Sequence, residues 1–284
     1  MAFNSIYRDG LFAGKTIVVS GGGTGIGRAT ARELAALGAT VVLCSRSPDH
    51  LAATRDEIVA AGGRATAEVC DVRDPGAVEA FFGAAVARYG PIDALINNAG
   101  GQFLAPAEEI TPNGWRAVVE TNLSGTFYMA RAAFAHSLRE HGGAIVNVVT
   151  EMWRGAPRMA HSGAARAGVV NLTQTLAIEW AQHGVRVNAV APGIVDSSGL
   201  ARYGGELAPV LAAFARDVPA GRMGTEREVA AAIIYLLSPA AAFISGETLR
   251  VDGVGSLYPL HGYRIPAHDP WPAFDPSLDA DAEE

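Results

Sequence analysis

Lysine is almost absent from this sequence. The 284 residues include 22 lysines and arginines together, yet Lys15 is the single lysine. No basic run occurs and the formal net charge is −7, which argues against a nucleic-acid or anionic-membrane partner. Lys15 precedes the first predicted strand, at the end of the sheet opposite to a ligand site. Chemistry that commonly uses a lysine therefore needs another cation here.

Cysteines and long apolar runs are scarce as well. Cys44 and Cys70 have no metal-type spacing and the histidines form no ligand pattern, so we expect buried thiols and no metal. No apolar run is long and uncharged enough for a transmembrane helix. The start "MAFNSIYRDGLFAGK" lacks the apolar segment of a secretory signal, and "DADAEE" is not a peroxisomal address. We expect a cytoplasmic protein without membrane insertion.

Short strand-like runs alternate with longer helical patterns, and 49% of the residues are hydrophobic. Strands are predicted at 16–20, 40–44, 64–70, 93–98, 143–149, 184–190 and 248–251, with helices between them, including a long one over 113–140. This alternation predicts an α/β fold, a Rossmann-type doubly wound parallel sheet of about seven strands with helices on both faces. We expect one domain over 1–254. The proline- and aromatic-rich segment 255–284 is predicted to pack on the surface or on a neighbouring subunit.

Three glycine-containing motifs fall at the carboxyl ends of predicted strands. "SGGGTGIG" (20–27) follows the first strand and opens the first helix, where glycines let a pyrophosphate approach the positive end of the helix. "NNAG" (97–100) follows the fourth strand and "PG" (192–193) follows the sixth. Together they line the crevice where such sheets bind ligands, so we predict a dinucleotide cofactor.

The end of the second strand, "LCSRS", indicates which cofactor. An NAD-binding protein usually has a carboxylate there that accepts a hydrogen bond from the ribose 2′-OH. Here Ser45 and Arg46 occupy the position, and both are suited to a 2′-phosphate. We predict NADP(H); the alternative is that Arg46 is a solvated surface charge.

Over roughly residues 10–254, these motifs resemble the short-chain dehydrogenase/reductase family. The resemblance implies an adenine-contacting acid at Asp71, a structural or catalytic asparagine at Asn122, a nicotinamide-amide contact at Ser197 and a homotetramer. The predicted cofactor-binding residues are Gly21, Gly23, Thr24, Gly25, Ile26, Gly27, Ser45, Arg46, Asp71, Val72, Asn98, Ala99, Gly100, Arg166, Pro192, Gly193, Ile194 and Ser197.

The family's acid–base pair is missing. Members that reduce carbonyls use a serine after the fifth strand and a Tyr-x-x-x-Lys helix, in which the lysine lowers the pKa of the tyrosine. This chain has Ser162 and Arg166 for the pair, and Val149 or Thr150 for the serine. A misaligned register does not explain the loss, because residues 129–202 contain no tyrosine. The pair has been replaced.

Ser162 and Arg166 lie four residues apart, so on a helix they share one face. Arginine stays charged, which makes it a poor acid but a good fixed cation for ribose hydroxyls and developing negative charge. A serine hydroxyl is not an acid matched to neutral pH. Reduction of a polarised C=C suits this set, because it places charge on a carbonyl oxygen that needs oriented donors, while the α-carbon takes its proton elsewhere.

Two groups within the family share long motifs with this chain. "GGQFLAPAE" (100–108), "HSGAARAGV" (161–169) and "HDPWP" (268–272) resemble peroxisomal trans-2-enoyl-CoA reductase, although a tyrosine assigned as catalytic there falls at Val170 here. "SIYRDGLFAGK" and "EMWRG" resemble bacterial citronellol or citronellal dehydrogenases. The leading prediction is reduction of an enoyl-CoA thioester. The alternatives are dehydrogenation of a terpenoid alcohol or aldehyde, and a catalytically silent NADP(H)-binding protein.

Three further residues are candidates for proton transfer or substrate contact. His161 could relay a proton or simply pack at the start of its helix. Glu151, just past the fifth strand, could orient a water or be a solvated carboxylate. Tyr203 falls in the variable segment that forms a substrate lid in the family. The predicted catalytic residues are Asn122, Thr150, Glu151, Ser162, Arg166 and Tyr203.

Overall fold

A seven-stranded sheet forms the centre of the computed structural model, which describes residues 7–197, 208–258 and 265–274. The strand order is β3-β2-β1-β4-β5-β6-β9, and every neighbouring pair is parallel. The strands are β1 (Thr16–Ser20), β2 (Thr40–Ser45), β3 (Arg64–Val69), β4 (Ala94–Asn97), β5 (Gly143–Val148), β6 (Val185–Pro192) and β9 (Thr248–Val251). The order reverses between β1 and β4, so a ligand crevice is expected outside the carboxyl ends of these two strands.

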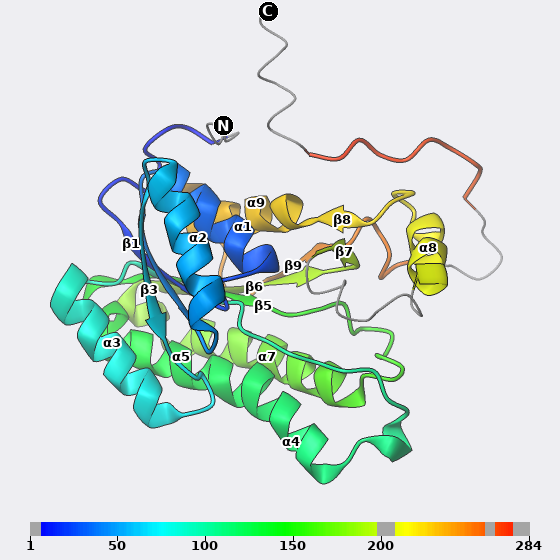
Figure 1. The fold of residues 1–284 in the computed structure, drawn as a ribbon, viewed down its shortest axis with the longest axis horizontal. Coiled ribbons are helices and arrows are strands. Elements are labelled where there is room, and N and C mark those ends of the chain that lie inside the picture. Colours follow the sequence, from blue (N-terminus) through cyan, green and yellow to red (C-terminus); the bar gives the residue numbers. More distant parts are fainter. Residues whose placement is uncertain (1–6, 198–207, 259–264, 275–284) are drawn as a thin grey trace, which may run out of the picture.

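Helices cover both faces of the sheet (Figure 1). One face carries α1 (Gly25–Ala36), α2 (Pro48–Ala60) and α9 (Glu226–Leu237); the other carries α3 (Pro75–Tyr89), α4 (Pro112–Val119), α5 (Gly125–Ala133) and α7 (Ala160–Glu179). Side chains of β1 alternate between the two layers: Ile17 and Val19 pack with α1 and α9, and Val18 packs with α3 and α5. Burial on both faces explains the continuous apolar runs of the strands. The predicted Rossmann-type fold is confirmed.

The long helix predicted over 113–140 is interrupted twice. A π-helical turn at Glu120–Ser124 separates α4 from α5, and a second at Phe134–Leu138 precedes the short α6 (Arg139–His141). Apolar periodicity does not reveal a π turn, because the pattern on either side remains helical. Such turns are frequent at functional sites, and the first one contains Asn122.

Short elements beyond β6 complete the described chain. β7 (Val195–Asp196) pairs with β8 (Gly224–Thr225), and α8 (Ala208–Asp217) lies between them in sequence. The C-terminal stretch 265–274 packs near α9, where the Trp271 N–H donates to the Ala220 carbonyl at 2.9 Å and Arg222 donates to the Trp271 carbonyl at 2.7 Å. Within the described residues, no helix is long and apolar enough to cross a bilayer.

Candidate active site

The glycine-rich turn after β1 is closed by hydrogen bonds to the end of β4. The Ser20 hydroxyl accepts from the N–H groups of Asn98 and Ala99, both at 3.1 Å, and the Asn98 side chain donates to the Gly21 carbonyl at 3.0 Å. Gly21 has a φ of +64°, and a Cβ at Gly27 would overlap the Gly21 carbonyl. The glycines therefore leave a space at this turn that larger side chains would fill. The space fits a dinucleotide pyrophosphate at the start of α1.

A small hollow beside this turn gathers the residues expected to select the cofactor. It has a volume of about 160 Å³, and its lining residues are Gly21, Gly23, Thr24, Ser45, Arg46, Ser47 and His50. Gly25 and Ile26 form the first turn of α1 next to it. Ser45 and Arg46 thus lie where the sequence predicted them, across from the glycines. Ser47 and His50, at the start of α2, were not predicted, although they follow the end of β2 within five residues.

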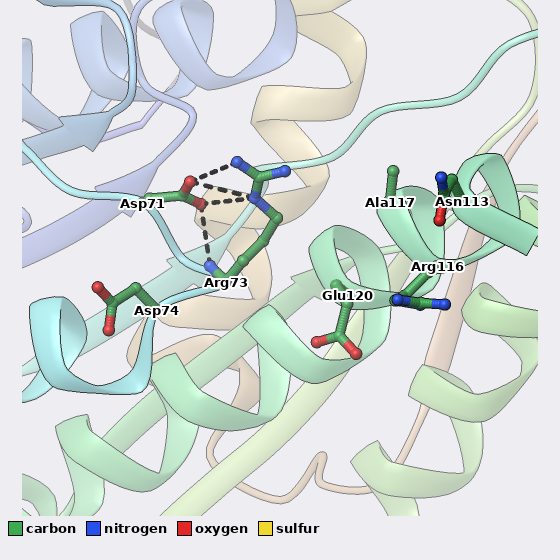
Figure 2. A pocket seen from close by; sticks show the side chains of 7 residues that line it. All are labelled: Asp71, Arg73, Asp74, Asn113, Arg116, Ala117 and Glu120. Atoms are coloured by element: carbon green, nitrogen blue, oxygen red, sulfur yellow. Dashed lines mark hydrogen bonds and ion pairs between the residues drawn. The ribbon is translucent and has the colours of Figure 1, made fainter.

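Asp71 lies at the edge of a second, larger hollow of about 510 Å³ between the start of α3 and α4. Figure 2 shows the Arg73 guanidinium folded onto its carboxylate, with Nη2–Oδ2 and Nε–Oδ1 distances of 2.6 and 2.9 Å. These hydrogen bonds lower the pKa of Asp71, which is ionised at neutral pH. Arg116 and Glu120 lie on the facing helical segment. Val72 is buried beneath, against Gly125.

Arg166 is buried on α7 and directed at the end of β5. Its Nη1 donates to the Val148 carbonyl at 2.5 Å, and a Cβ at Gly100 would overlap its guanidinium. The glycine of the Asn-Ala-Gly motif thus provides the space for this cation. Burial lowers the pKa of Arg166 to about 10, so the side chain is charged at neutral pH. A fixed positive charge therefore lies beside the crevice, where the family has a lysine.

Asn122 joins the same loop to the π turn. Its Oδ1 accepts from the Gly101 N–H at 2.9 Å and its Nδ2 donates to the Gly101 carbonyl at 2.9 Å. The side chain is fully buried, with both amide groups paired. In this structure Asn122 holds the loop that contacts Arg166.

Ser162 lies one helical turn before Arg166 on α7, and both are buried. The Ser162 hydroxyl donates to Oε1 of Gln102 at 2.9 Å, a partner that the sequence did not predict. The Gln102 amide group remains a further donor at this point. His161 is buried against the Phe103 ring, its Nδ1 accepts from the Ser162 N–H at 2.7 Å, and burial lowers its pKa. His161 is therefore neutral at neutral pH, and its Nε2 is buried without a hydrogen-bond partner among the described residues.

The segment after β5 presents Thr150 and Glu151 next to the Pro-Gly turn. Val149 is buried in the core, whereas Thr150 is half-buried, so Thr150 is the more accessible of the two serine-position candidates. The Glu151 N–H donates to the Pro192 carbonyl at 3.2 Å. Glu151 is not a plainly solvated carboxylate, because its Oε1 is buried without a partner in the described part of the chain.

The residues predicted after β6 lie close to β9. The Gly193 N–H donates to the Val251 carbonyl at 3.0 Å, and a Cβ at Gly193 would lie 2.8 Å from that of Asp252. The Ile194 carbonyl accepts from Gly224 at 2.9 Å, and Ser197 is half-buried at the end of this segment. Tyr203 lies outside the described residues.

The structure bears on metal and thiol chemistry too. Cys44 and Cys70 are buried and free, and burial raises the pKa of Cys70 to about 11. Across the described ranges, no three His, Cys, Asp or Glu side chains are grouped so as to hold a metal ion.

A doubly wound sheet with a glycine-rich turn, an Asn-Ala-Gly loop and a modified Tyr-x-x-x-Lys position defines the class of protein. The chain belongs to the short-chain dehydrogenase/reductase family, whose members are oxidoreductases that bind a nicotinamide cofactor. Residues 21–254 match the family described as enoyl-(acyl carrier protein) reductase. The chain is therefore an oxidoreductase of this family, as predicted.

Similar proteins carry two kinds of name. The chain is 40% identical to a probable 2,4-dienoyl-CoA reductase of Bacillus subtilis (strain 168), over 86% of this chain and 98% of that protein. It is 48% identical to a citronellol catabolism dehydrogenase of Pseudomonas aeruginosa PAO1, with a TM-score of 0.81 over 89% of this chain and all of that one. An actinorhodin polyketide ketoreductase variant with NADPH is 34% identical, with a TM-score of 0.83 over 88% and 100%.

Proposed function

We propose that this chain is an NADP(H)-dependent reductase that acts on a carbon–carbon double bond conjugated to an acyl-CoA thioester. The observation that carries the proposal is the buried Ser162–Arg166 face of α7, which offers a fixed cation and oriented donors but no neutral-pH acid. Such a set stabilises the charge that develops on a thioester oxygen. The 2,4-dienoyl-CoA reductase name of the Bacillus subtilis relative supports this substrate class.

The preference for NADP(H) over NAD(H) rests on the hollow at the glycine-rich turn. Arg46, Ser45 and Ser47 line it together with the turn, and no carboxylate is among its lining residues. Guanidinium and hydroxyl groups bind a 2′-phosphate through charge-assisted hydrogen bonds. When bound, NADPH supplies the hydride. The similar ketoreductase structure with NADPH supports the same cofactor.

The remaining predicted residues have supporting roles in this proposal. Asn98 and Asn122 hold the loops on either side of the crevice, and Asp71, whose carboxylate is held by Arg73, is assigned to the adenine amine. Of the two candidates for the family's serine position, Val149 and Thr150, we assign the role to Thr150, whose hydroxyl would add a donor to the substrate oxygen. The Pro192–Gly193 turn and Ser197 would hold the nicotinamide amide.

The second candidate is oxidation of a citronellol-like alcohol or reduction of the aldehyde. The 48% identity to a citronellol catabolism dehydrogenase favours it. An isolated carbonyl needs an acid at its oxygen, and the α7 pair Ser162 and Arg166 supplies none at neutral pH. This candidate therefore needs a proton donor outside α7.

One panel of assays separates the two. NADPH oxidation is followed by absorbance with 2-enoyl-CoA and 2,4-dienoyl-CoA thioesters, and NADP⁺ reduction is followed with citronellol. We expect turnover of at least one thioester class at more than ten times the rate with citronellol. Turnover of citronellol with no thioester activity contradicts the leading proposal and supports the second. Replacing NADPH by NADH in the same assays tests the cofactor.

The proposal extends to assembly and location. We expect a cytoplasmic homotetramer in which 1–254 is the NADP-binding domain and 255–284 an extension that packs on the surface or on a neighbouring subunit. The contacts of 265–274 with Ala220 and Arg222 support surface packing of that part. Light scattering of the purified full chain measures the mass; a monomer contradicts the tetramer.

A further inference from the structure

Glu151 is a titratable residue at the carboxyl ends of β5 and β6 whose role is still unexplained. It follows β5 by three residues, and its backbone N–H is bonded to the Pro192 carbonyl at 3.2 Å. The residue is thereby held beside the Pro192–Gly193 turn, at the carboxyl ends of β5 and β6. One carboxyl oxygen, Oε1, is buried and has no hydrogen-bond partner among the described residues. A buried carboxylate oxygen without a partner is costly, and protonation of the group removes that cost.

The groups that face Glu151 come from its own loop and from the end of β9. Asp252 is a second carboxylate, and its oxygens accept from the backbone N–H groups of Val254 and Ser256, both at 3.0 Å. Arg154 and Arg250 are the nearby cations. Arg250 lies over the Trp153 ring at 4.1 Å, and donates to the Ser256 hydroxyl at 3.3 Å.

Burial and Asp252 outweigh the two cations. Desolvation is the largest cause and the Asp252 charge the second, so the pKa of Glu151 is raised above its ordinary value. Because Asp252 is already bound to two backbone N–H groups, Glu151 is the carboxyl group of this pair that is suited to carry a proton. A carboxyl group with a raised pKa that lies at the carboxyl ends of the strands, as Glu151 does, is the kind of acid that works near neutral pH.

Other groups at this end of the site are less suited to give up a proton. Arg166 is buried and charged, and deprotonating it needs a pH near 10. Ser162 is a weak acid, and its hydroxyl hydrogen is already donated to Gln102. His161 is neutral because burial lowers its pKa, and its ring is enclosed against Phe103.

We propose that Glu151 is the proton donor of the double-bond reduction, in place of the absent tyrosine. This inference rests on the proposed reductase function. Arg166 and the Gln102 amide group, which Ser162 orients by its hydrogen bond to Oε1, stabilise the negative charge on the thioester oxygen, and Glu151 protonates the α-carbon. The cation and the acid are therefore two separate residues on α7 and on the loop after β5.

The reduction of the double bond balances in protons and electrons. The hydride adds to the alkene carbon remote from the thioester, and the π electrons of the C=C bond move to the carbonyl oxygen as an enolate. The enolate carbon then forms a C–H bond while the O–H bond of Glu151 breaks. The substrate gains two electrons, NADPH loses two, and the carboxylate recovers its proton from water.

The test uses the full-length protein and three variants. Glu151→Gln keeps the shape but cannot release a carboxyl proton, and Glu151→Asp keeps the acid on a shorter chain. Glu179→Gln is the control, an exposed carboxylate at the far end of α7. With the best thioester, we expect kcat to fall about 100-fold in Glu151→Gln, a typical contribution of a general acid. Glu151→Asp should recover part of the loss, and the control should equal wild type. NADPH affinity and thermal unfolding should be unchanged in all three.

The pH dependence separates an acid from a structural residue. Glu151 must be protonated to act, so wild-type kcat should be full below its raised pKa and fall as the pH rises through it. Glu151→Gln should lack this descending limb. A variant that keeps more than half of wild-type kcat with the same pH profile overturns the inference, while thioester turnover by wild type leaves the proposed function standing. A wild type that reduces no thioester overturns both.

A second readout needs no catalysis. Infrared titration of the cofactor-free protein should show a protonated-carboxyl band that persists above the pH at which exposed carboxyl groups ionise. The band should be missing from Glu151→Gln and present in Glu179→Gln. A wild-type protein without such a band contradicts the role of Glu151 as the acid.

Discussion

The two ends of the crevice differ in how they depend on side chains. At the glycine-rich turn, the groups that matter are backbone N–H donors and the space left by Gly21 and Gly27, and the family's residues are all kept. At the α7 end, Ser162 and Arg166 stand in place of the tyrosine and the lysine. A backbone cradle tolerates little change, because a Cβ blocks it. A catalytic group tolerates replacement when another residue supplies the same charge.

The largest change in cofactor affinity is expected at the adenosine end of the crevice. On the proposed NADP(H) preference, replacing Arg46 by Asp removes a charge-assisted contact to the 2′-phosphate, worth about 1.5–3 kcal/mol, and adds repulsion. We expect NADPH affinity to fall about 100-fold, since each 1.4 kcal/mol is about tenfold, while NADH affinity holds or improves. Fluorescence titration of both cofactors measures this.

Arg55→Asp is the matched control for this change. Arg55 lies on α2, the helix that follows the Arg46 loop, and its partner is the exposed Asp56 rather than the cofactor hollow. An equal loss of NADPH affinity in both variants would show that Arg46 acts through general surface charge.

At the reaction end, Arg166→Ala should weaken NADPH binding or kcat/KM at least tenfold. The substitution removes the fixed cation and leaves the Val148 carbonyl without its donor. Arg166→Lys restores a charge at the family's usual position and should recover part of the loss. Steady-state kinetics and cofactor titration give the values, with thermal unfolding to report on folding. Unchanged kinetics in Arg166→Ala would mean that the cation is not used.

The smallest effect is expected at Ser162. Ser162→Ala removes one neutral hydrogen bond to Gln102, worth about 0.5–1.5 kcal/mol. We expect kcat/KM to fall about threefold to tenfold, with the pH profile retained because Glu151 still carries the proton. Loss of the pH dependence in Ser162→Ala would instead assign the acid to the serine.

Much of the fold could be predicted from the amino-acid pattern. Apolar runs of four to eight residues marked the strands, and glycine or proline residues marked their ends, so the seven strands of the sheet were found within a few residues. The π turns were not found, because the widened turn at Glu120–Ser124 leaves the apolar spacing on both sides helical. The two-residue strands β7 and β8 are too short to carry a pattern of their own.

Some residues of the candidate site could be predicted from the sequence and others could not. Motifs that are continuous in sequence, such as 20–27 and 97–100, could be placed at strand ends by their spacing from the apolar runs. Gln102, His50 and Asp252 could not, because each gains its role from a neighbour distant in the chain. The position of Gln102, two residues past the Asn-Ala-Gly motif, is the signal that could have drawn attention to it.

The sequence by itself determined that the tyrosine–lysine acid–base pair of the family is missing. Lys15 is the single lysine, and residues 129–202 contain no tyrosine. No shift of the alignment therefore recovers a Tyr-x-x-x-Lys pair. The tertiary structure decided what takes its place. The space beside Gly100 and the Val148 carbonyl fix the Arg166 guanidinium in place, and burial together with the Asp252 charge raises the pKa of Glu151. Both effects depend on neighbours that are distant in the chain, which composition and spacing do not report.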